Sequence, residues 1–96
     1  TIEKVVEKMC HNPAILVNIK KRGFIREGYK ADLCLVDPDS QWTVAKENIL
    51  YKCGWSPFEG MTFSSKVIGT IVNGTVVYDN GIFNEGYRGS KLEFER

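Results

Sequence analysis

The spacing of apolar residues changes once along the chain, from a helical period to a strand period. Over residues 2–10, apolar side chains recur every three or four positions between charged ones, which predicts an amphipathic helix. Asn12-Pro13 is expected to end this helix, because the residue before a proline disfavours the α conformation. A second short helix is expected over residues 14–19. Basic residues and Gly23 follow it, as suits a helix C-terminus and its cap.

Short strands are predicted beyond Gly23. Residues 31–36 form a continuous apolar run, which indicates a strand covered on both faces. Cys34 lies within this run and is expected to be a small buried hydrophobe. Residues 42–44 are expected to be extended and residues 46–50 to form a helical turn.

The strongest local pattern is a hairpin near the C-terminal end. Two runs of β-branched residues, 67–72 and 75–78, flank Asn73-Gly74, the dipeptide preferred in a two-residue type I′ turn. Asn80-Gly81 predicts a second tight turn. Beyond Gly86 the chain is polar with scattered large residues, and its composition leaves open whether it docks on the body or hangs free.

These elements define an α+β chain. We predict one or two N-terminal helices over residues 1–22, followed over residues 23–96 by a small, mostly antiparallel β-sheet and a tail. So few strands leave open edges unless a partner strand, another chain or the rest of a longer protein covers them.

Composition narrows the class of protein. The chain has 96 residues, 43% of them hydrophobic, and its 13 basic and 12 acidic residues leave a net charge of +1. This length predicts one globular domain at most. The near-zero net charge gives no long-range electrostatic attraction for nucleic acid. No apolar run reaches the roughly 20 residues that cross a membrane. The chain opens without methionine on helical sequence, so we expect a piece of a longer protein.

Three cysteines at spacings of 24 and 19 suit neither paired disulfides nor a zinc knuckle, which favours a reduced, cytoplasmic setting.

Few residues are suited to catalysis. His11 is the only histidine, and beside the expected helix end it is predicted to bond a helix-terminal backbone group. Cys10 and His11 do not form half a metal site, because adjacent helical residues point about 100° apart. Asp32 either points to solvent or pairs with a lysine. The remaining aspartates have the ordinary turn role of this residue type: Asp37, Asp39 and Asp79.

The peptide from Ser56 to Gly60 is the most distinctive in the chain. Read as chemistry, Ser56 is a nucleophile and Glu59 a base; read as structure, Pro57 and Gly60 shape a loop that Phe58 anchors. The structural reading prevails because no histidine or lysine lies close in sequence. No catalytic, cofactor-binding or metal-ligating residue is therefore predicted.

Four motifs together resemble the C-terminal segment of the cyclic amidohydrolases, and within them the long-chain dihydroorotase family. They are His11-Asn12-Pro13-Ala14, Gly28-Tyr29-Lys30-Ala31-Asp32-Leu33 with Val36-Asp37-Pro38, Ser56-Pro57-Phe58-Glu59-Gly60, and Val72-Asn73-Gly74-Thr75-Val76-Val77-Tyr78. Single pieces recur in many amidohydrolases, whereas their order and spacing are specific.

The resemblance implies a parent enzyme with a zinc-dependent TIM barrel and a β-sandwich built from both chain ends, which interconverts N-carbamoyl-L-aspartate and dihydroorotate. The family's metal ligands, an H-x-H pair, a carboxylated lysine, two further histidines and an aspartate, match no position here. The resemblance therefore implies an inactive, zinc-free portion comprising the last barrel helices and half of the sandwich. Its expected partners are the missing barrel and N-terminal sandwich strands, or a second copy bound through open strand edges.

Two alternatives remain open. Allantoinase and dihydropyrimidinase share much of the pattern, and Phe58-Glu59-Gly60-Met61 is close to a dihydropyrimidinase loop, whereas the tail from Tyr87 to Phe94 is more similar to dihydroorotase endings. A self-standing β-rich interaction module, whose open edge binds a partner strand, is the alternative from another class.

Overall fold

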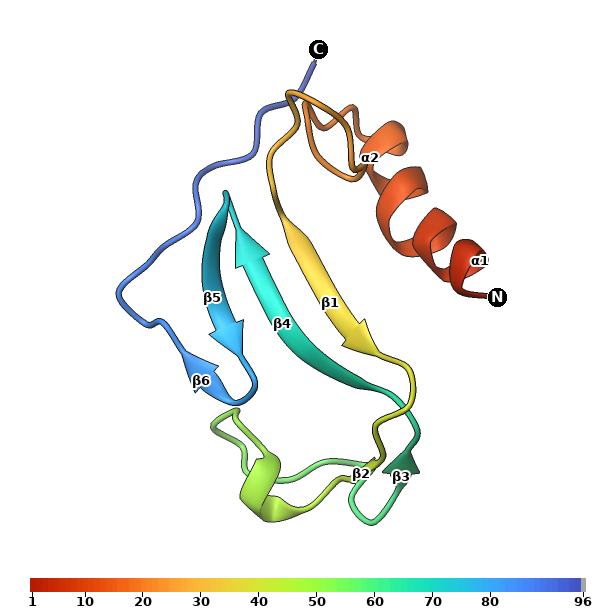
Figure 1. Cartoon of the computed structure of the whole chain (residues 1–96), viewed down its shortest axis with the longest axis vertical. Coiled ribbons are helices and arrows are strands. Elements are labelled where there is room, and N and C mark those ends of the chain that lie inside the picture. Colours follow the sequence, from red (N-terminus) through yellow and green to blue (C-terminus); the bar gives the residue numbers. More distant parts are fainter. Residues whose placement is uncertain (96) are drawn as a thin grey trace.

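A computed structural model describes residues 1–95. A helical segment comes first, a four-stranded antiparallel sheet follows, and a two-stranded ribbon lies beyond one end of that sheet (Figure 1). The strand order in the sheet is β1-β4-β5-β6, and β2 pairs with β3 in the ribbon. The predicted α+β arrangement is confirmed.

The elements have the following bounds. The helical ones are α1 (Ile2–Val6), a π-helical segment (Glu7–His11), α2 (Asn12–Leu16) and a 3₁₀ turn (Lys46–Asn48). The strands are β1 (Leu33–Asp37), β2 (Trp42–Thr43), β3 (Thr62–Phe63), β4 (Lys66–Val72), β5 (Thr75–Asp79) and β6 (Ile82–Phe83).

The first helix does not end at Asn12-Pro13, so that prediction is wrong. Asn12 has helical angles, φ −63° and ψ −43°, and its N–H donates to the carbonyl of Glu7, five residues back. A proline ring crowds the carbonyl four residues before it, here that of Met9, and the wider π turn accommodates this. Residues 2–16 therefore form one continuous helix with a π segment before the proline.

The helix ends at Leu16, earlier than predicted, through a Schellman motif. The N–H of Ile19 donates to the carbonyl of Ala14 at 2.9 Å, and the N–H of Asn18 donates to that of Ile15 at 3.2 Å. Asn18 takes the left-handed conformation, φ 55°, that this motif needs. Asparagine adopts this conformation more readily than most residues, so the cap forms here.

Gly23 does not cap the helix as predicted but lies against its side. Its φ is +83°, and a Cβ at this position would come within 2.5 Å of the Ala14 Cβ and 2.8 Å of the Cys10 carbonyl oxygen. Ala14 is only 5% exposed. Glycine is thus required by both the backbone conformation and the close approach of the loop to the helix.

Both predicted tight turns are confirmed. Asn73 and Gly74 have φ of 48° and 81°, as a type I′ turn requires, and β4 pairs with β5 across them. Asn80 and Gly81, with φ of 45° and 92°, join β5 to β6 in the same way. The predicted extended piece near residue 42 and helical turn near residue 46 are also present, as β2 and the 3₁₀ turn.

Very little of the chain is buried. Among residues 1–95, only Ala14 and Val44 are buried hydrophobic residues. The accessible surface is 7927 Å², whereas a compact chain of this mass exposes about 5,600 Å². The radius of gyration is 15.5 Å, against about 12.5 Å for a compact domain of this length. About 2,300 Å² of surface is therefore exposed beyond what a compact domain shows.

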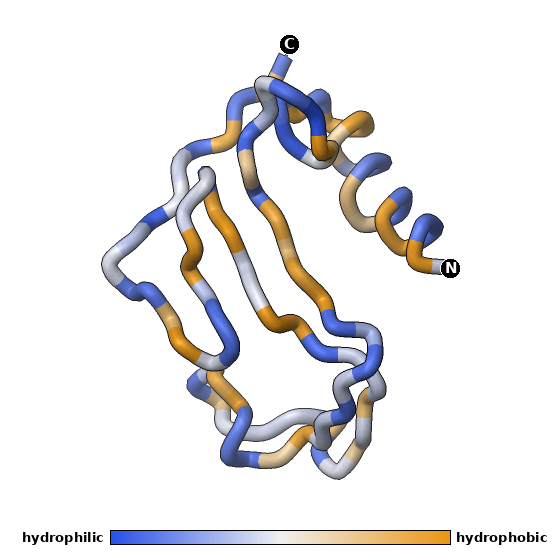
Figure 2. Tube along the Cα trace, in the orientation of Figure 1, coloured by the Kyte–Doolittle hydropathy of each residue, from blue (hydrophilic) through white to orange (hydrophobic). Residues whose placement is uncertain are grey.

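The prediction that β1 is covered on both faces, with Cys34 buried, is wrong for the chain alone. Cys34 is exposed, and Leu35 and Val36 are 44% and 53% exposed. Figure 2 shows the hydrophobic run of β1 beside that of β4, with no second sheet over them in the described part. Within residues 1–95, the apolar run of β1 therefore remains partly exposed.

Candidate functional site

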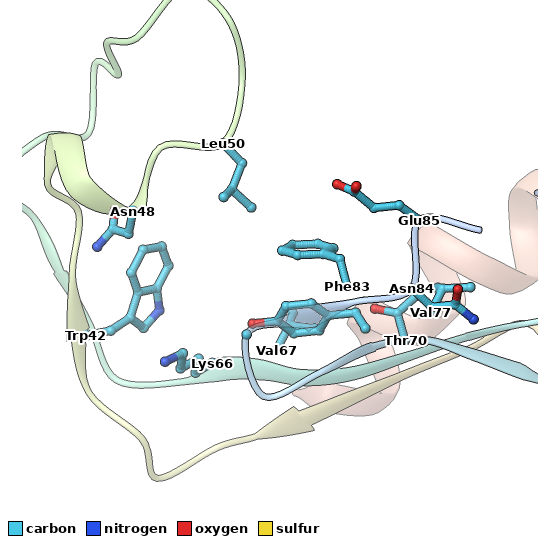
Figure 3. Close-up of a pocket in the computed structure, with 12 residues that line it drawn as sticks. Trp42, Asn48, Leu50, Lys66, Val67, Thr70, Val77, Phe83, Asn84 and Glu85 are labelled. Atoms are coloured by element: carbon cyan, nitrogen blue, oxygen red, sulfur yellow. The ribbon is translucent and has the colours of Figure 1, made fainter. Parts of the chain in front are cut away.

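An apolar groove of about 740 Å³ is the first candidate site. Strands β4 to β6 form one wall, and β2 with the segment after it forms the other. Figure 3 shows Trp42, Leu50 and Phe83 around the hollow. The full set of lining residues is Trp42, Asn48, Leu50, Lys66, Val67, Thr70, Val77, Tyr78, Gly81, Phe83, Asn84 and Glu85.

Aromatic contacts hold the walls of this groove in place. The rings of Tyr78 and Phe83 lie 4.8 Å apart between their centroids, and those of Trp42 and Phe63 lie 5.6 Å apart. The Trp42 indole N–H donates to the carbonyl of Ser65 at 2.8 Å. Leu50 is 76% exposed. The groove therefore presents a mostly apolar surface.

The groups needed for metal-assisted hydrolysis do not come together in the described residues. No three side chains among the histidine, cysteines, aspartates and glutamates of residues 1–95 are placed to hold one metal ion. The residues present therefore do not fit the zinc that the family resemblance implies for the parent enzyme.

A polar cluster joins four distant segments, and sequence reasoning missed it. The Arg22 guanidinium pairs with Asp32 and donates to Asn73 Oδ1 at 3.3 Å and to the Ser90 hydroxyl at 3.4 Å. Asp32 also accepts the backbone N–H of Asn73 at 2.8 Å, and the Asn73 amide donates to Ser90 at 2.7 Å. Arg22 and Ser90 are 68 residues apart, so no sequence pattern pointed to the pair.

This cluster settles the open reading of Asp32. Asp32 precedes β1 and pairs with an arginine, not with a lysine or with solvent alone. The Arg22 side chain is only 12% exposed, and the oxygens of Asp32, Asn73 and Ser90 accept from its planar guanidinium group. The arrangement holds segments together, and it contains no base paired with a nucleophile.

His11 is a packing residue. Its ring stacks on Phe24 with 4.1 Å between centroids and an angle of 9°, in place of the predicted hydrogen bond to the helix end. The Arg26 guanidinium lies 4.1 Å from the centroid of the same phenyl ring. These contacts bind the loop after the helix to the π segment.

The loop from Ser56 to Gly60 forms turns held by its own backbone, as the structural reading expects, whereas Phe58, expected to anchor it in apolar surroundings, is 53% exposed and meets the edge of the Phe63 ring at 6.4 Å between centroids. The Ser56 hydroxyl accepts the N–H of Phe58 at 3.1 Å, and the N–H of Glu59 donates to the Ser56 carbonyl at 3.2 Å. Gly60, with φ +89°, donates its N–H to the carbonyl of Val44 at 2.8 Å. The aspartates predicted in turns also have a structural role. The Asp37 carboxylate accepts the backbone N–H of Asp39, and the Asp79 carboxylate accepts the side-chain amide of Asn80.

Comparison with known proteins shows the family to which this chain belongs. The profile described as "Amidohydrolase family" matches residues 1–77. The chain belongs to the amidohydrolase family, which confirms the resemblance drawn from the four motifs. No helix among residues 1–95 is both long enough and apolar enough to span a bilayer.

Individual relatives carry more specific names. A dihydroorotase from Pyrococcus furiosus is 37% identical over 92 residues, which are 96% of this chain and 22% of that protein. A dihydroorotase from Clostridium acetobutylicum is 40% identical over 80 residues, 83% of this chain and 19% of that protein. The solved L-hydantoinase (dihydropyrimidinase) from Arthrobacter aurescens superposes with a TM-score of 0.76 at 33% identity, covering 88% of this chain and 19% of that chain. The chain thus spans about a fifth of the length of these relatives.

Proposed function

We propose that this chain is the C-terminal, non-catalytic part of a dihydroorotase, a cyclic amide hydrolase that interconverts N-carbamoyl-L-aspartate and dihydroorotate. The observation that carries the proposal is the 37% identity to a dihydroorotase across 96% of the chain. The four motifs occur in the order and spacing of that family. Residues 1–22 would then belong to the barrel wall and residues 23–96 to the sandwich.

In this proposal the chain is a scaffold. The catalytic zinc and its ligands are supplied by the rest of the enzyme, since residues 1–95 bring no three suitable side chains together. The large exposed surface supports the same role, because burying an excess of about 2,300 Å² on this side and a similar area on its partner gives a total of about 4,600 Å², in the range of permanent interfaces. The partner is the remainder of the enzyme, and the setting is the cytoplasm.

A chimera tests the scaffold role. The segment of the Pyrococcus furiosus dihydroorotase that matches this chain is replaced by residues 1–96, and hydrolysis of dihydroorotate is measured with zinc present. We expect turnover above that of the same enzyme with the segment deleted. A folded chimera that is as inactive as the deletion variant would contradict the proposal.

The assignment of the substrate is tested separately. The complete polypeptide that carries these residues is assayed with dihydroorotate, dihydrouracil, hydantoin and allantoin. We expect the highest kcat/KM for dihydroorotate. The fold match to the hydantoinase favours dihydropyrimidinase as the second candidate, and a preference for dihydrouracil or hydantoin would select it.

A further inference from the structure

Residues 84–95, which we call the strap, follow β6 and run back past the hairpin turn to the end of the helix (Figure 1). They lie outside the part of the chain that the family profile matches, which ends at residue 77. The strap has no helix and no strand longer than a single bridge, yet it is held at three places along its length. These attachments show that the strap is fixed to the rest of the described chain and is not a free tail.

The far end of the strap pairs with the backbone just after the helix. The N–H of Lys20 donates to the carbonyl of Glu93 at 2.8 Å, and the N–H of Glu95 donates to the carbonyl of Asn18 at 2.9 Å. Ile19 and Phe94 form an antiparallel bridge between them. This pairing begins within the Schellman motif, so the strap is attached to the point where the helix ends.

The middle of the strap is attached to the hairpin turn. Ser90 accepts the side-chain amide of Asn73 at 2.7 Å and lies 3.4 Å from Arg22, whose guanidinium also pairs with Asp32. The loop after the helix and the β4–β5 turn therefore meet at Ser90, and the entry to β1 is linked to them through Asp32, which pairs with Arg22 and accepts the N–H of Asn73. The near end is attached to β5 by the N–H of Asn84, which donates to the carbonyl of Val77 at 2.9 Å.

We infer that the strap is an intramolecular clamp that fixes the helix relative to the sheet. Apart from the strap, the helix and the sheet are joined through residues 17–32, which contain turns and bends but no strand, and the one bridge residue among them, Ile19, pairs with Phe94 of the strap itself. The strap adds a second connection, with attachments only a few residues apart, so that closing the intervening loops costs little entropy. The inference concerns contacts within residues 1–95 and does not depend on the reaction of the parent enzyme.

Hydrogen exchange in the complete polypeptide tests the clamp. A variant ending at Glu85 lacks the middle and far attachments. The readouts are the amides of Lys30 and Gly74, which donate to the carbonyls of Lys21 and Ala31 and not to the strap. One net hydrogen bond corresponds to about a fivefold change in an opening equilibrium. We expect both amides to exchange at least about fivefold faster, and unchanged rates at both would overturn the inference.

Point variants keep the test independent of whether the truncated protein folds. Ser90→Ala removes the hydroxyl that joins the strap to Asn73, so exchange at Gly74 is expected to rise about fivefold. Arg88→Ala is the matched control, because within residues 1–95 the Arg88 side chain bonds only to the carbonyls of Glu85 and Tyr87, both in the strap. Equal exchange at Gly74 in the two variants would show that the strap is a passive tail.

Discussion

Substitution of Gly23 by alanine should loosen the end of the helix far more than the same substitution at Gly28. Both glycines have nearly the same left-handed conformation, with φ of +83° and +82°. They differ in space: a Cβ at Gly28 would meet no atom within 4 Å, whereas one at Gly23 would lie 2.5 Å from the Ala14 Cβ. The pair therefore separates backbone strain from steric overlap.

The two effects have different sizes. A left-handed alanine costs about 1–2 kcal/mol, and this is the whole expected effect of Gly28→Ala. Overlap with packed atoms adds about 1–3 kcal/mol, so Gly23→Ala should cost roughly 2–5 kcal/mol. The Cys10 carbonyl, 2.8 Å from the added Cβ, is part of the helix backbone and has little room to move. Relief would require the loop to move away from the helix.

Native-state hydrogen exchange at Ile19 measures this difference. Its N–H donates to the carbonyl of Ala14 in the helix cap, so its protection reports on opening of the segment that Gly23 contacts. In the complete polypeptide, protection should fall about 5- to 150-fold more in Gly23→Ala than in Gly28→Ala, the equivalent of about 1–3 kcal/mol. Equal losses in the two variants would mean that strain alone matters and that the close approach to the helix is not present.

Three further outcomes are expected. Arg22→Ala should lower the free energy of unfolding by about 1–3 kcal/mol in urea titrations, because Asp32 and Ser90 lose a charged donor, and Arg22→Lys should recover only part of this; full recovery would contradict a role for the planar fork. Cys34 should react quickly with a maleimide in the isolated chain and slowly in the complete polypeptide, since the proposed partner covers β1; equal rates would contradict that cover. The isolated chain should retain no stoichiometric zinc by atomic emission, and a bound equivalent held by His11 and neighbouring acids would overturn the scaffold proposal.

The elements predicted correctly from the sequence are those that neighbouring residues decide. Asn73-Gly74 selects a type I′ turn because both residues accept positive φ, and the flanking β-branched runs then pair as β4 and β5. The 3₁₀ turn after β2 and the turn at Asn80-Gly81 are equally local. The end of the helix was predicted wrongly, because Asn12-Pro13 ends a helix in most contexts, whereas here a π segment accommodates the proline.

The polar cluster and the burial of each strand depend on residues far apart in the chain. Arg22 joins segments up to 68 residues away, a pairing that no local pattern encodes. The apolar run of β1 correctly indicated a strand, but the prediction of Cys34 as buried assumed a cover that residues 1–95 lack.

The amino-acid sequence alone thus determined the turns, the strand periods and the family, because each depends on residue type and spacing. Only the tertiary structure showed where the helix stops, what Gly23 contacts, which segments Arg22 binds together and where the strap is attached. The helix end depends on how the π segment accommodates Pro13 and on the cap at Asn18, whereas the other three features arise between segments that only folding brings together.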